Sequence, residues 1–509
     1  MSEIKISNLT FAYEGGYENI FENVNLSLDT DWRTGLIGRN GRGKTTLLRL
    51  ILGRLKEGSS YEGSIISPEL WGYFPFEIGE DEIKTNTLEL LERHCEDLEY
   101  WKLCVELSEL SMDAGLLERD FDKLSKGEQT RVMLAALFSV DDSFLLIDEP
   151  TNHLDMEGRR ILGEYLQKKR GFILVSHDRS LLNLCTDHII SLNPSEIEVV
   201  KGNFDSWYKN KSDRDKAELD ENLRLKKDIK RLSESARRAG AWSDKVEKTK
   251  SGTRISGVKA DKGHIGHMAA KAMKRAKNIE SRKLRAIEEK RGLLKNIENS
   301  EELKLMPLKF HKERLLEFRD AAVGYSINQG AGGEKPKAVV KDLSFSLMRG
   351  EKAAIKGRNG SGKSSVIRLI LGEEGPMLLS GSFQMAAGVK ISYVPQDTEH
   401  LRGLPESVIE GTDIDRTLFF SVLRKLDFGR EDLMRDMREL SSGQRKKVML
   451  AKSLAEKAHL YIWDEPLNYI DIFSRIAIEN MLKETDMTMI FIEHDSSFVE
   501  NVSNKILCL

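Results

Sequence analysis

The sequence predicts an α/β protein in which two tandem domains of the same fold are joined by a long α-helical hairpin. Three observations predict this architecture. The 509 residues exceed the length of one ordinary domain. Four short motifs occur twice in the same order. The segment between the two sets differs in charge and carries apolar residues at helical spacing.

The repeat is defined by pairs of motifs. Their separation is nearly constant, since 319 residues separate Lys44 from Lys363 and 316 separate Glu149 from Glu465. One match could arise by chance, whereas four in register indicate a duplicated domain. We therefore place one domain at residues 1–207 and the other at residues 306–509. The pairs are GRNGRGKTT from Gly38 with GRNGSGKSS from Gly357, LSKGEQ from Leu124 with LSSGQ from Leu440, IDEP ending at Pro150 with WDEP ending at Pro466, and SHD from Ser176 with EHD from Glu493.

The first motif in each copy has the form GxxxxGK[ST], between an apolar stretch and an apolar helix. Its glycines let backbone N–H groups wrap phosphates at a helix N-terminus. The lysine reaches the β- and γ-phosphates of ATP, and the following hydroxyl holds Mg²⁺. The predicted ATP-binding residues are Gly38, Arg39, Asn40, Gly41, Arg42, Gly43, Lys44, Thr45 and Thr46, and Gly357, Arg358, Asn359, Gly360, Ser361, Gly362, Lys363, Ser364 and Ser365.

Two carboxylates follow an apolar strand in each copy, in FLLIDE and LYIWDE. We expect Asp148 and Asp464 to hold Mg²⁺ together with Thr45 and Ser364. Glu149 and Glu465 are the expected catalytic bases that polarise the attacking water. The next apolar strand ends at a histidine, and we expect His177 and His494 to act in catalysis by contacting the γ-phosphate.

LSKGEQ and LSSGQ, together with the preceding motifs, resemble the signature of ATP-binding cassettes over both halves of the chain. The resemblance implies two tandem ATP-binding-cassette P-loop domains that pair head to tail within one monomer, with two ATPs at the interface. Ser441, Gly443 and Gln444 then complete the site built on Lys44. Ser125, Gly127 and Glu128 complete the site built on Lys363. Tyr13 and Tyr325 are candidates to stack on adenine, although a role in the core explains these aromatics about as well.

The segment at residues 208–305 is read as a basic helical hairpin with a tip near residues 242–267. Residues 211–300 hold 26 Lys and Arg against 14 Asp and Glu, a balance of +12, whereas the rest of the chain carries −15. Leu225, Ile229, Leu232 and Ala236 recur at helical spacing. Met273, Ala276 and Ile279 do so further on, after a glycine-rich stretch. At 1.5 Å per residue, a helix of roughly 40 residues spans about 60 Å.

Several classes of protein are disfavoured by composition. No run of 18 apolar residues predicts a membrane span. The N-terminus lacks the pattern of a secretory signal. The four scattered cysteines fit a reduced, cytoplasmic protein without a disulfide framework or a zinc site.

Two fused cassettes with a charged helical linker and no membrane domain resemble the ABC-F family of translation factors. The resemblance implies a ribosome-associated protein whose linker enters the exit tRNA site of the 70S ribosome. The tip then approaches the peptidyl-transferase centre, 23S rRNA and peptidyl-site tRNA. The basic charge of the linker fits an RNA partner.

Within ABC-F the chain resembles the antibiotic-resistance branch, the Lsa- and Vga-like ribosome-protection proteins. The long linker tip, the YFPF and EPLNYID sequences and the short segment at residues 80–120 carry this resemblance. It implies that the tip displaces lincosamides, pleuromutilins and streptogramin A. The candidate tip residues are Trp242, Lys245, Lys248, Lys250, Arg254, Val258 and Lys259.

The two copies differ at positions that matter for hydrolysis. Gln396 of the second copy can ligate Mg²⁺, whereas Phe76 of the first cannot. Leu467 and Tyr469 stand where the first copy has Thr151 and His153. We therefore expect both sites to hydrolyse ATP, at unequal rates.

Three alternative functions remain open. The first is a housekeeping ABC-F factor that acts on stalled or vacant ribosomes without a resistance role. The second is a DNA-repair cassette ATPase, which is disfavoured because such proteins insert a coiled coil within a cassette rather than between two. The third is the soluble half of a transporter complex.

Overall fold

The computed structural model describes residues 3–13, 19–54, 60–66, 71–95, 97–141, 143–152, 154–192, 197–249, 274, 281–282, 303, 305–328 and 334–509. The chain divides into two compact units, Met1–Trp207 with Glu302–Leu509, and Tyr208–Glu301. The first unit contains both repeats. We call residues 1–207 domain 1 and residues 306–509 domain 2.

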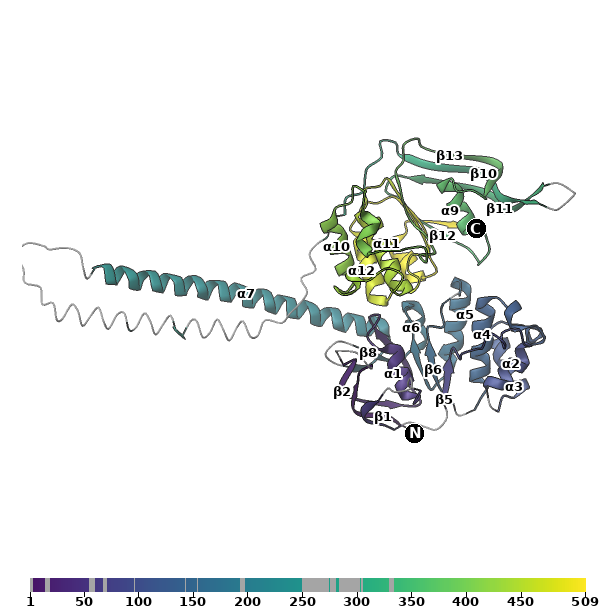
Figure 1. The fold of residues 1–509 in the computed structure, drawn as a ribbon, viewed down its shortest axis with the longest axis horizontal. Helices are drawn as coiled ribbons and strands as arrows, with labels where there is room; N and C mark the ends of the chain where they lie inside the picture. Colours follow the sequence, from purple (N-terminus) through teal and green to yellow (C-terminus); the bar gives the residue numbers. More distant parts are fainter. Residues whose placement is uncertain are drawn as a thin grey trace, which may run out of the picture. The chain divides into compact units, whose positions relative to one another are not determined.

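Domain 1 has two sheets in its described part (Figure 1). An antiparallel sheet has the order β2-β1-β4, and a six-stranded sheet has the order β5-β6-β7-β3-β8-β9, parallel except for β9. The strands are β1 (Glu3–Phe11), β2 (Phe21–Asp29), β3 (Arg33–Gly38), β4 (Tyr61–Ile66), β5 (Trp71–Phe74), β6 (Phe144–Asp148), β7 (Phe172–Val175), β8 (His188–Leu192) and β9 (Ile197–Lys201). The helices are α1 (Lys44–Ile51), α2 (Thr87–His94), α3 (Tyr100–Glu109), α4 (Lys126–Phe138), α5 (Met156–Lys168) and α6 (Arg179–Cys185).

Domain 2 repeats this plan. Its described residues form a β11-β10-β13 antiparallel sheet and a parallel β14-β15-β16-β12-β17 sheet, which matches β5-β6-β7-β3-β8 of domain 1 strand for strand. The strands are β10 (Arg314–Asn328), β11 (Glu334–Met348), β12 (Lys352–Lys356), β13 (Met377–Met385), β14 (Ile391–Val394), β15 (Leu460–Asp464), β16 (Met489–Ile492) and β17 (Lys505–Cys508). The helices are α9 (Lys363–Leu371), α10 (Arg416–Lys425), α11 (Ser442–Ala455), α12 (Ile472–Lys483) and α13 (Ser496–Val502).

Equivalent helices of the two domains begin at an aspartate N-cap. Asp155 and Asp471 cap α5 and α12 by accepting backbone N–H bonds, and Asp178 and Asp495 do the same for α6 and α13. An aspartate at this position satisfies N–H groups that have no partner within the helix. These short polar breaks after apolar strands therefore fix where each helix begins.

The parallel sheets place the predicted functional residues at one edge. The strands β3, β6 and β7 are neighbours, and their carboxyl ends carry the glycine loop, Asp148 and His177. In open α/β sheets ligands bind beyond the carboxyl ends of the strands. The apolar faces of the strands pack into cores that include Leu36, Leu146 and Ile173 of domain 1, each at most 1% exposed.

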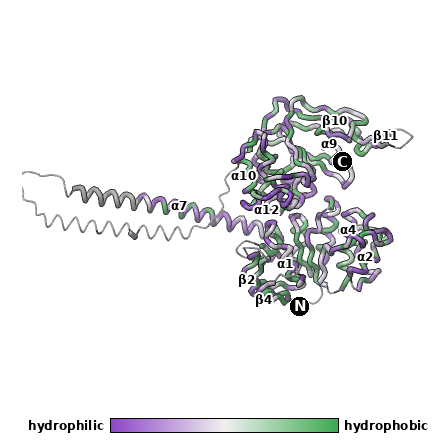
Figure 2. Tube along the Cα trace, in the orientation of Figure 1, coloured by the Kyte–Doolittle hydropathy of each residue, from purple (hydrophilic) through white to green (hydrophobic). Residues whose placement is uncertain are grey.

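A 46-residue helix, α7 (Phe204–Thr249), begins four residues before the predicted linker boundary at 208. The reason is that Phe204 and Trp207 are each 1% exposed and belong to the first compact unit. The described part of α7 is mostly hydrophilic (Figure 2). Trp242, Lys245 and Lys248 lie on α7. Lys250, Arg254, Val258, Lys259, the rest of the tip and the predicted return helix lie outside the described residues, apart from isolated positions.

None of the helices in the described part of the chain is both long and apolar enough to cross a membrane. The four cysteines are all described, and each is free.

Candidate nucleotide sites

The two glycine loops join β3 to α1 and β12 to α9. Gly43 and Gly362, the N-cap residues of these helices, have φ values of 85° and 93°, in the left-handed region that favours glycine. A Cβ on Gly43 would lie 2.6 Å from Ile20 Cγ2, and one on Gly362 would lie 2.6 Å from Val340 Cγ2. The tight turn exposes the N–H groups at the helix N-terminus, which is the arrangement that binds phosphate.

The two loop lysines are folded into their own loops. Lys44 Nζ donates to Gly38 O at 2.8 Å and to Arg39 O at 3.2 Å. Lys363 Nζ donates to Gly357 O at 2.9 Å and to Arg358 O at 3.0 Å. Burial lowers the pKa of both lysines. The ammonium groups are thereby held where phosphate oxygens would approach. We call the two positions the Lys44 site and the Lys363 site.

The residues predicted to hold Mg²⁺ are close together. Thr45 Oγ1 donates to Asp148 Oδ2 at 2.7 Å, and Ser364 hydrogen-bonds to Asp464 in the equivalent position. Burial raises the pKa of Asp148, and raises that of Asp464 to about 6. Asp464 Oδ1 is buried without a hydrogen-bond partner among the described residues. A hydroxyl beside a carboxylate with an unsatisfied oxygen fits Mg²⁺, which prefers oxygen ligands.

Each predicted base lies beside the predicted histidine. Glu149 Oε1 is 3.3 Å from His177 Nε2, and Glu465 Oε1 is 3.5 Å from His494 Nε2. Both glutamates have positive φ, 51° and 46°. Each lines the pocket that contains the glycine loop of its own domain. The backbone N–H of Glu149 donates to Val175 O at 2.9 Å, which ties this turn to β7.

The two glutamates differ in their surroundings. Burial, together with the neighbouring Asp148, raises the pKa of Glu149 to about 7. Burial also opposes ionisation of Glu465, but bonds from His494, Gln396 and Asn468 outweigh it and hold the pKa of Glu465 at about 2. The amides of Gln396 and Asn468 donate to Glu465 Oε2 at 2.8 and 2.7 Å.

Phe76, which stands in domain 1 where domain 2 has Gln396, makes different contacts. Its ring stacks on His94 of α2, with centroids 4.7 Å apart. Domain 1 instead supplies Tyr73, whose hydroxyl lies 3.4 Å from Asp148 Oδ2. Gln396, which the sequence predicts as a ligand of Mg²⁺, donates its amide N–H to the predicted base Glu465.

The signature motifs form the N-termini of α4 and α11. Ser125 and Ser441 are the N-caps, and each makes a reciprocal capping box with the residue three positions on, Glu128 or Gln444. Ser125 Oγ also donates to the Glu128 carboxylate at 2.7 Å. In this structure Glu128 and Gln444 shape the helix start, and the helix dipole there favours an anion.

Two pockets bring motifs from both domains together. A pocket of about 470 Å³ contains the Lys44 site, and one of about 1130 Å³ contains the Lys363 site. The smaller is lined by Tyr13, Asn40, Gly41, Gly43, Lys44, Thr45, Thr46, Asp148, Glu149 and His177, with Ser441 and Gly443 of domain 2. The larger is lined by Asn359, Gly360, Gly362, Lys363, Ser364, Ser365, Gln396, Glu465 and His494, with Ser125 and Gly127 of domain 1.

Some of the predicted ATP-binding and metal-binding residues do not line these pockets. Among the described residues, Gly38, Arg39 and Arg42 do not line the smaller pocket, and Gly357, Arg358, Ser361 and Asp464 do not line the larger one. Arg39 instead forms an ion pair with Asp427 of domain 2. The predicted adenine-stacking residue Tyr13 is 40% exposed, and its hydroxyl hydrogen-bonds to Thr46 Oγ1. Tyr325 makes the equivalent bond to Ser365.

The glycine loops also touch the opposite domain. Asn40 Nδ2 donates to Tyr469 O at 3.0 Å, and Asn359 N donates to Asp155 Oδ2 at 3.4 Å. The pockets are also lined by four residues that follow the predicted bases, namely Asn152, Asp155, Asn468 and Tyr469. The sequence marked Tyr469 as a difference between the copies, but it did not identify Asn152, Asn468 or Asp155 as site residues, although the NHLD and NYID stretches lie beside the glutamates.

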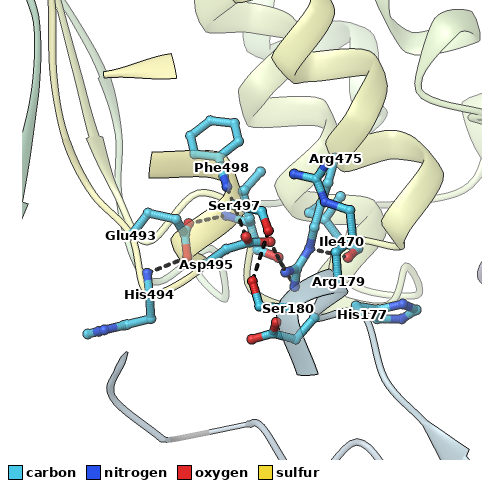
Figure 3. A network of polar contacts seen from close by, with 12 residues as sticks. His177, Arg179, Ser180, Ile470, Arg475, Glu493, His494, Asp495, Ser497 and Phe498 are labelled. Atoms are coloured by element: carbon cyan, nitrogen blue, oxygen red, sulfur yellow. Dashed lines mark hydrogen bonds and ion pairs between the residues drawn. The ribbon is translucent and has the colours of Figure 1, made fainter. Parts of the chain in front are cut away.

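A polar network joins the domains beside the predicted histidines (Figure 3). Arg179 of α6 forms a buried ion pair with Glu479 of α12 at 2.8 Å. Ser180 Oγ lies 2.8 Å from Ser496 Oγ and 2.8 Å from Ser497 Oγ at the start of α13. These contacts follow directly after His177 and His494, so the two histidine segments meet at the interface.

Comparison with known proteins agrees with this geometry. Residues 21–152 and 340–468, just over half of the chain, match the ABC transporter family. The ribosome protection protein VmlR of Bacillus subtilis is 27% identical over 528 residues, which cover 100% of this chain and 87% of VmlR. ABC transporter F family member 2 of Arabidopsis thaliana is 24% identical over 560 residues, covering 99% of this chain and 76% of that protein.

A solved structure shares the fold. A chain in the complex of archaeal ribosomal stalk protein aP1 and archaeal ribosome recycling factor aABCE1 superposes with a TM-score of 0.58. The match covers 96% of this chain and 84% of that chain at 18% identity, so it bears on the fold alone.

Proposed function

This chain belongs to the ABC family of ATPases and to its ABC-F branch, and from that premise we propose that it is an ATP-gated ribosome-protection factor. The chain is an ATP hydrolase, converting ATP and water to ADP and phosphate. The finer proposal is that ATP-driven pairing of the domains places the linker tip near the peptidyl-transferase centre of the 70S ribosome. We place the protein in the cytoplasm, associated with ribosomes.

The proposed chemistry follows from the described residues. The loop N–H groups and Lys44 or Lys363 bind phosphate oxygens of the substrate ATP. Thr45 with Asp148, and Ser364 with Asp464, would hold Mg²⁺, which would neutralise phosphate charge. Glu149 and Glu465 orient water and accept its proton, while His177 and His494 lie beside them. The signature N-terminus of the opposite domain supplies positive potential to the γ-phosphate.

The observation that carries the gating proposal is that each pocket is lined from both domains. An ATP bound to Lys44 would contact Ser441 and Gly443, and one bound to Lys363 would contact Ser125 and Gly127. The γ-phosphate thus holds the domains together, and its removal weakens the interface. A ligand shifts such an equilibrium only through its different affinity for the two states.

The ribosome proposal rests on the linker and on the relatives. Residues 211–300 carry a balance of +12, which favours an RNA-lined site for this segment. VmlR is named a ribosome protection protein. We therefore assign 23S rRNA and peptidyl-site tRNA as the surfaces that the tip contacts. The proposed outcome is displacement of lincosamides, pleuromutilins and streptogramin A.

The gating model is tested with Glu149→Gln plus Glu465→Gln, which keeps ATP bound. Sedimentation through a sucrose gradient with 70S ribosomes and ATP should show the double variant retained on the ribosome while the wild-type protein dissociates. Lys44→Ala plus Lys363→Ala, which loses phosphate contacts, is the matched control and should remain unbound. Release of the double glutamine variant at the wild-type rate would contradict gating.

A housekeeping ABC-F role is the second candidate, because the similarity extends at comparable identity to a plant ABC-F family member that carries no resistance name. The two functions are separated by drug-challenged translation in vitro. Under the resistance proposal, added protein restores synthesis in the presence of a lincosamide or pleuromutilin. Under the housekeeping alternative, it changes synthesis on stalled ribosomes but does not restore it in the presence of drug.

A further inference from the structure

A buried lysine of domain 2 joins the helix that carries the second signature to two strand ends of the Lys363 site. Lys446 lies in α11 and is 3% exposed. Its ammonium donates to Pro395 O at 2.7 Å, to Gln396 O at 2.9 Å and to Asp464 O at 3.5 Å. An ammonium has three N–H donors, so these three backbone carbonyls satisfy it. They belong to the ends of β14 and β15, which are neighbouring parallel strands.

These carbonyls flank the chemical groups of the Lys363 site. The side chain of Gln396 donates to Glu465 Oε2 at 2.8 Å, and Asp464 carries the carboxylate that faces Ser364. Lys446 therefore fixes the distance between α11 and the two backbone segments that position the base and the metal-binding carboxylate. Lys446 also lines the pocket of the Lys363 site, but its three described hydrogen bonds go to these backbone carbonyls.

The same helix serves the other pocket. Ser441, Ser442 and Gly443, at the N-terminus of α11, line the pocket of the Lys44 site. Lys446 lies five residues beyond Ser441, about 7.5 Å along the helix axis. Backbone hydrogen bonds make the first turns of α11 rigid. A displacement of Lys446 therefore moves the signature residues as well.

In the described part of domain 1 the equivalent residue makes a different contact. Thr130 occupies the equivalent position, 316 residues before Lys446. Thr130 Oγ1 donates to Lys126 O of its own helix at 3.0 Å. Its short side chain does not bridge α4 to the ends of β5 and β6. Among the described residues, this link between the signature helix and the strand ends is therefore made through α11 and not through Thr130 of α4.

We propose that Lys446 is a positioning residue that transmits the state of the Lys363 site to the Lys44 site. A shift of the Gln396 segment or of Asp464 pulls on Lys446, and α11 carries this shift to the serine and glycine that face the Lys44 phosphates. The proposal rests on ATP hydrolysis alone and is independent of any ribosomal role.

The test uses the full chain in two backgrounds. Glu465→Gln leaves the Lys44 site as the active one, and Glu149→Gln leaves the Lys363 site. Lys446→Met is added to each, and kcat and KM for ATP are measured. We expect KM of the Lys44 site to rise more than about fivefold, although Lys446 does not line that pocket. Lys446→Arg, which keeps donors at this position, should restore at least part of the affinity.

Unchanged kcat and KM at the Lys44 site, with a loss confined to the Lys363 site, would overturn the coupling and leave a local structural role. If the Lys446→Met variant unfolds at a lower temperature than wild type, Lys446→Thr, which introduces the residue of domain 1, is measured in its place. Thr130→Val is the matched control and should change turnover of the Lys363 site by less than about twofold. A larger effect of Thr130→Val would contradict the claim that the link runs through α11 and not through Thr130 of α4.

Discussion

At the scale of single residues, the two sites have the same arrangement of residues, but the predicted bases differ in pKa. Glu149 has a pKa of about 7 because it is buried beside Asp148, whereas bonds from His494, Gln396 and Asn468 hold the pKa of Glu465 at about 2. A carboxylate with a pKa near neutral is the stronger base, and a strongly hydrogen-bonded one is fixed in orientation but weakly basic. This difference gives a physical basis for the prediction of unequal hydrolysis rates.

Gly443 of the second signature is tightly enclosed. A Cβ at this position would lie 2.3 Å from Tyr469 O, the carbonyl that also accepts the bond from Asn40. Gly443→Ala must therefore push α11 away from this carbonyl and from the first glycine loop. We predict that ATP turnover at the Lys44 site, measured in the Glu465→Gln background, falls by about tenfold or more.

The matched control for this change is Gly79→Ala, because a Cβ at Gly79 meets nothing closer than 3.5 Å. It should leave turnover unchanged. Equal turnover of the Gly443→Ala and parent proteins would show that the close approach of Tyr469 O is not maintained in solution.

At the scale of elements, buried ion pairs anchor the helices of domain 2. Lys447 of α11 donates to Asp471, the N-cap of α12, at 2.7 Å, and their side chains are 5% and 0% exposed. Arg475 pairs with Asp495, the N-cap of α13, at 3.0 Å. Burial opposes ionisation of Asp471 and Asp495, but Lys447 and Arg475 outweigh it and hold the pKa of each aspartate below its usual range.

These depressed pKa values predict acid sensitivity. In the folded protein the aspartates stay ionised at pH values where the unfolded chain is protonated. Their contribution to stability is therefore complete above the unfolded pKa of about 3.9 and is lost progressively as pH falls below it. We predict that the urea midpoint decreases steeply below about pH 4. Urea unfolding followed by circular dichroism across this range measures it.

The control for the acid prediction replaces one pair by neutral residues. Lys447→Met plus Asp471→Asn keeps a good N-cap and removes both charges. Its urea midpoint should depend less on pH than that of the parent. Lys447→Met alone leaves a buried carboxylate unpaired and should cost about 3–5 kcal/mol at neutral pH. A single variant as stable as the parent would contradict the buried pairing.

Prediction from sequence succeeded where the signal is local. The strand before each glycine loop, the helix after it and the strand ending at Asp148 are all set by short apolar runs with glycine or aspartate at their ends. The contacts of Lys446, Tyr73 and Asn468 were not foreseen, because each depends on which strands become neighbours. The sequence set a linker boundary at residue 208 but gave no start for the linker helix. α7 begins at Phe204, since Phe204 and Trp207 are part of the domain core although they are helical.

At the scale of the whole molecule, the duplicated domains are joined asymmetrically in their described residues. Arg179 and Glu479 form the buried pair at the interface. The residues at the equivalent positions of the repeat are Ser496 and Gly163, which cannot form an ion pair. In contrast, the pairs Arg159–Asp178 and Arg475–Asp495, which lie within the domains, occur in both copies. Duplication therefore preserved the internal pairs, whereas the Arg179–Glu479 pair between the domains is present at one of the two equivalent positions.

This one-sided contact predicts a measurable coupling between the domains. The side chains of Arg179 and Glu479 are 11% and 3% exposed, so Arg179→Met leaves a buried carboxylate unpaired and should destabilise the protein by about 3–5 kcal/mol. Replacing both by methionine removes the unpaired charge and should recover most of that loss. A double-mutant cycle of urea unfolding then gives a coupling energy above about 1 kcal/mol.

Arg159→Met, which breaks a pair inside domain 1, is the control. Its loss of unfolding free energy should add to that of Glu479→Met without a coupling energy. A coupling between Arg179 and Glu479 below about 0.5 kcal/mol would mean that the domains do not hold this contact in solution.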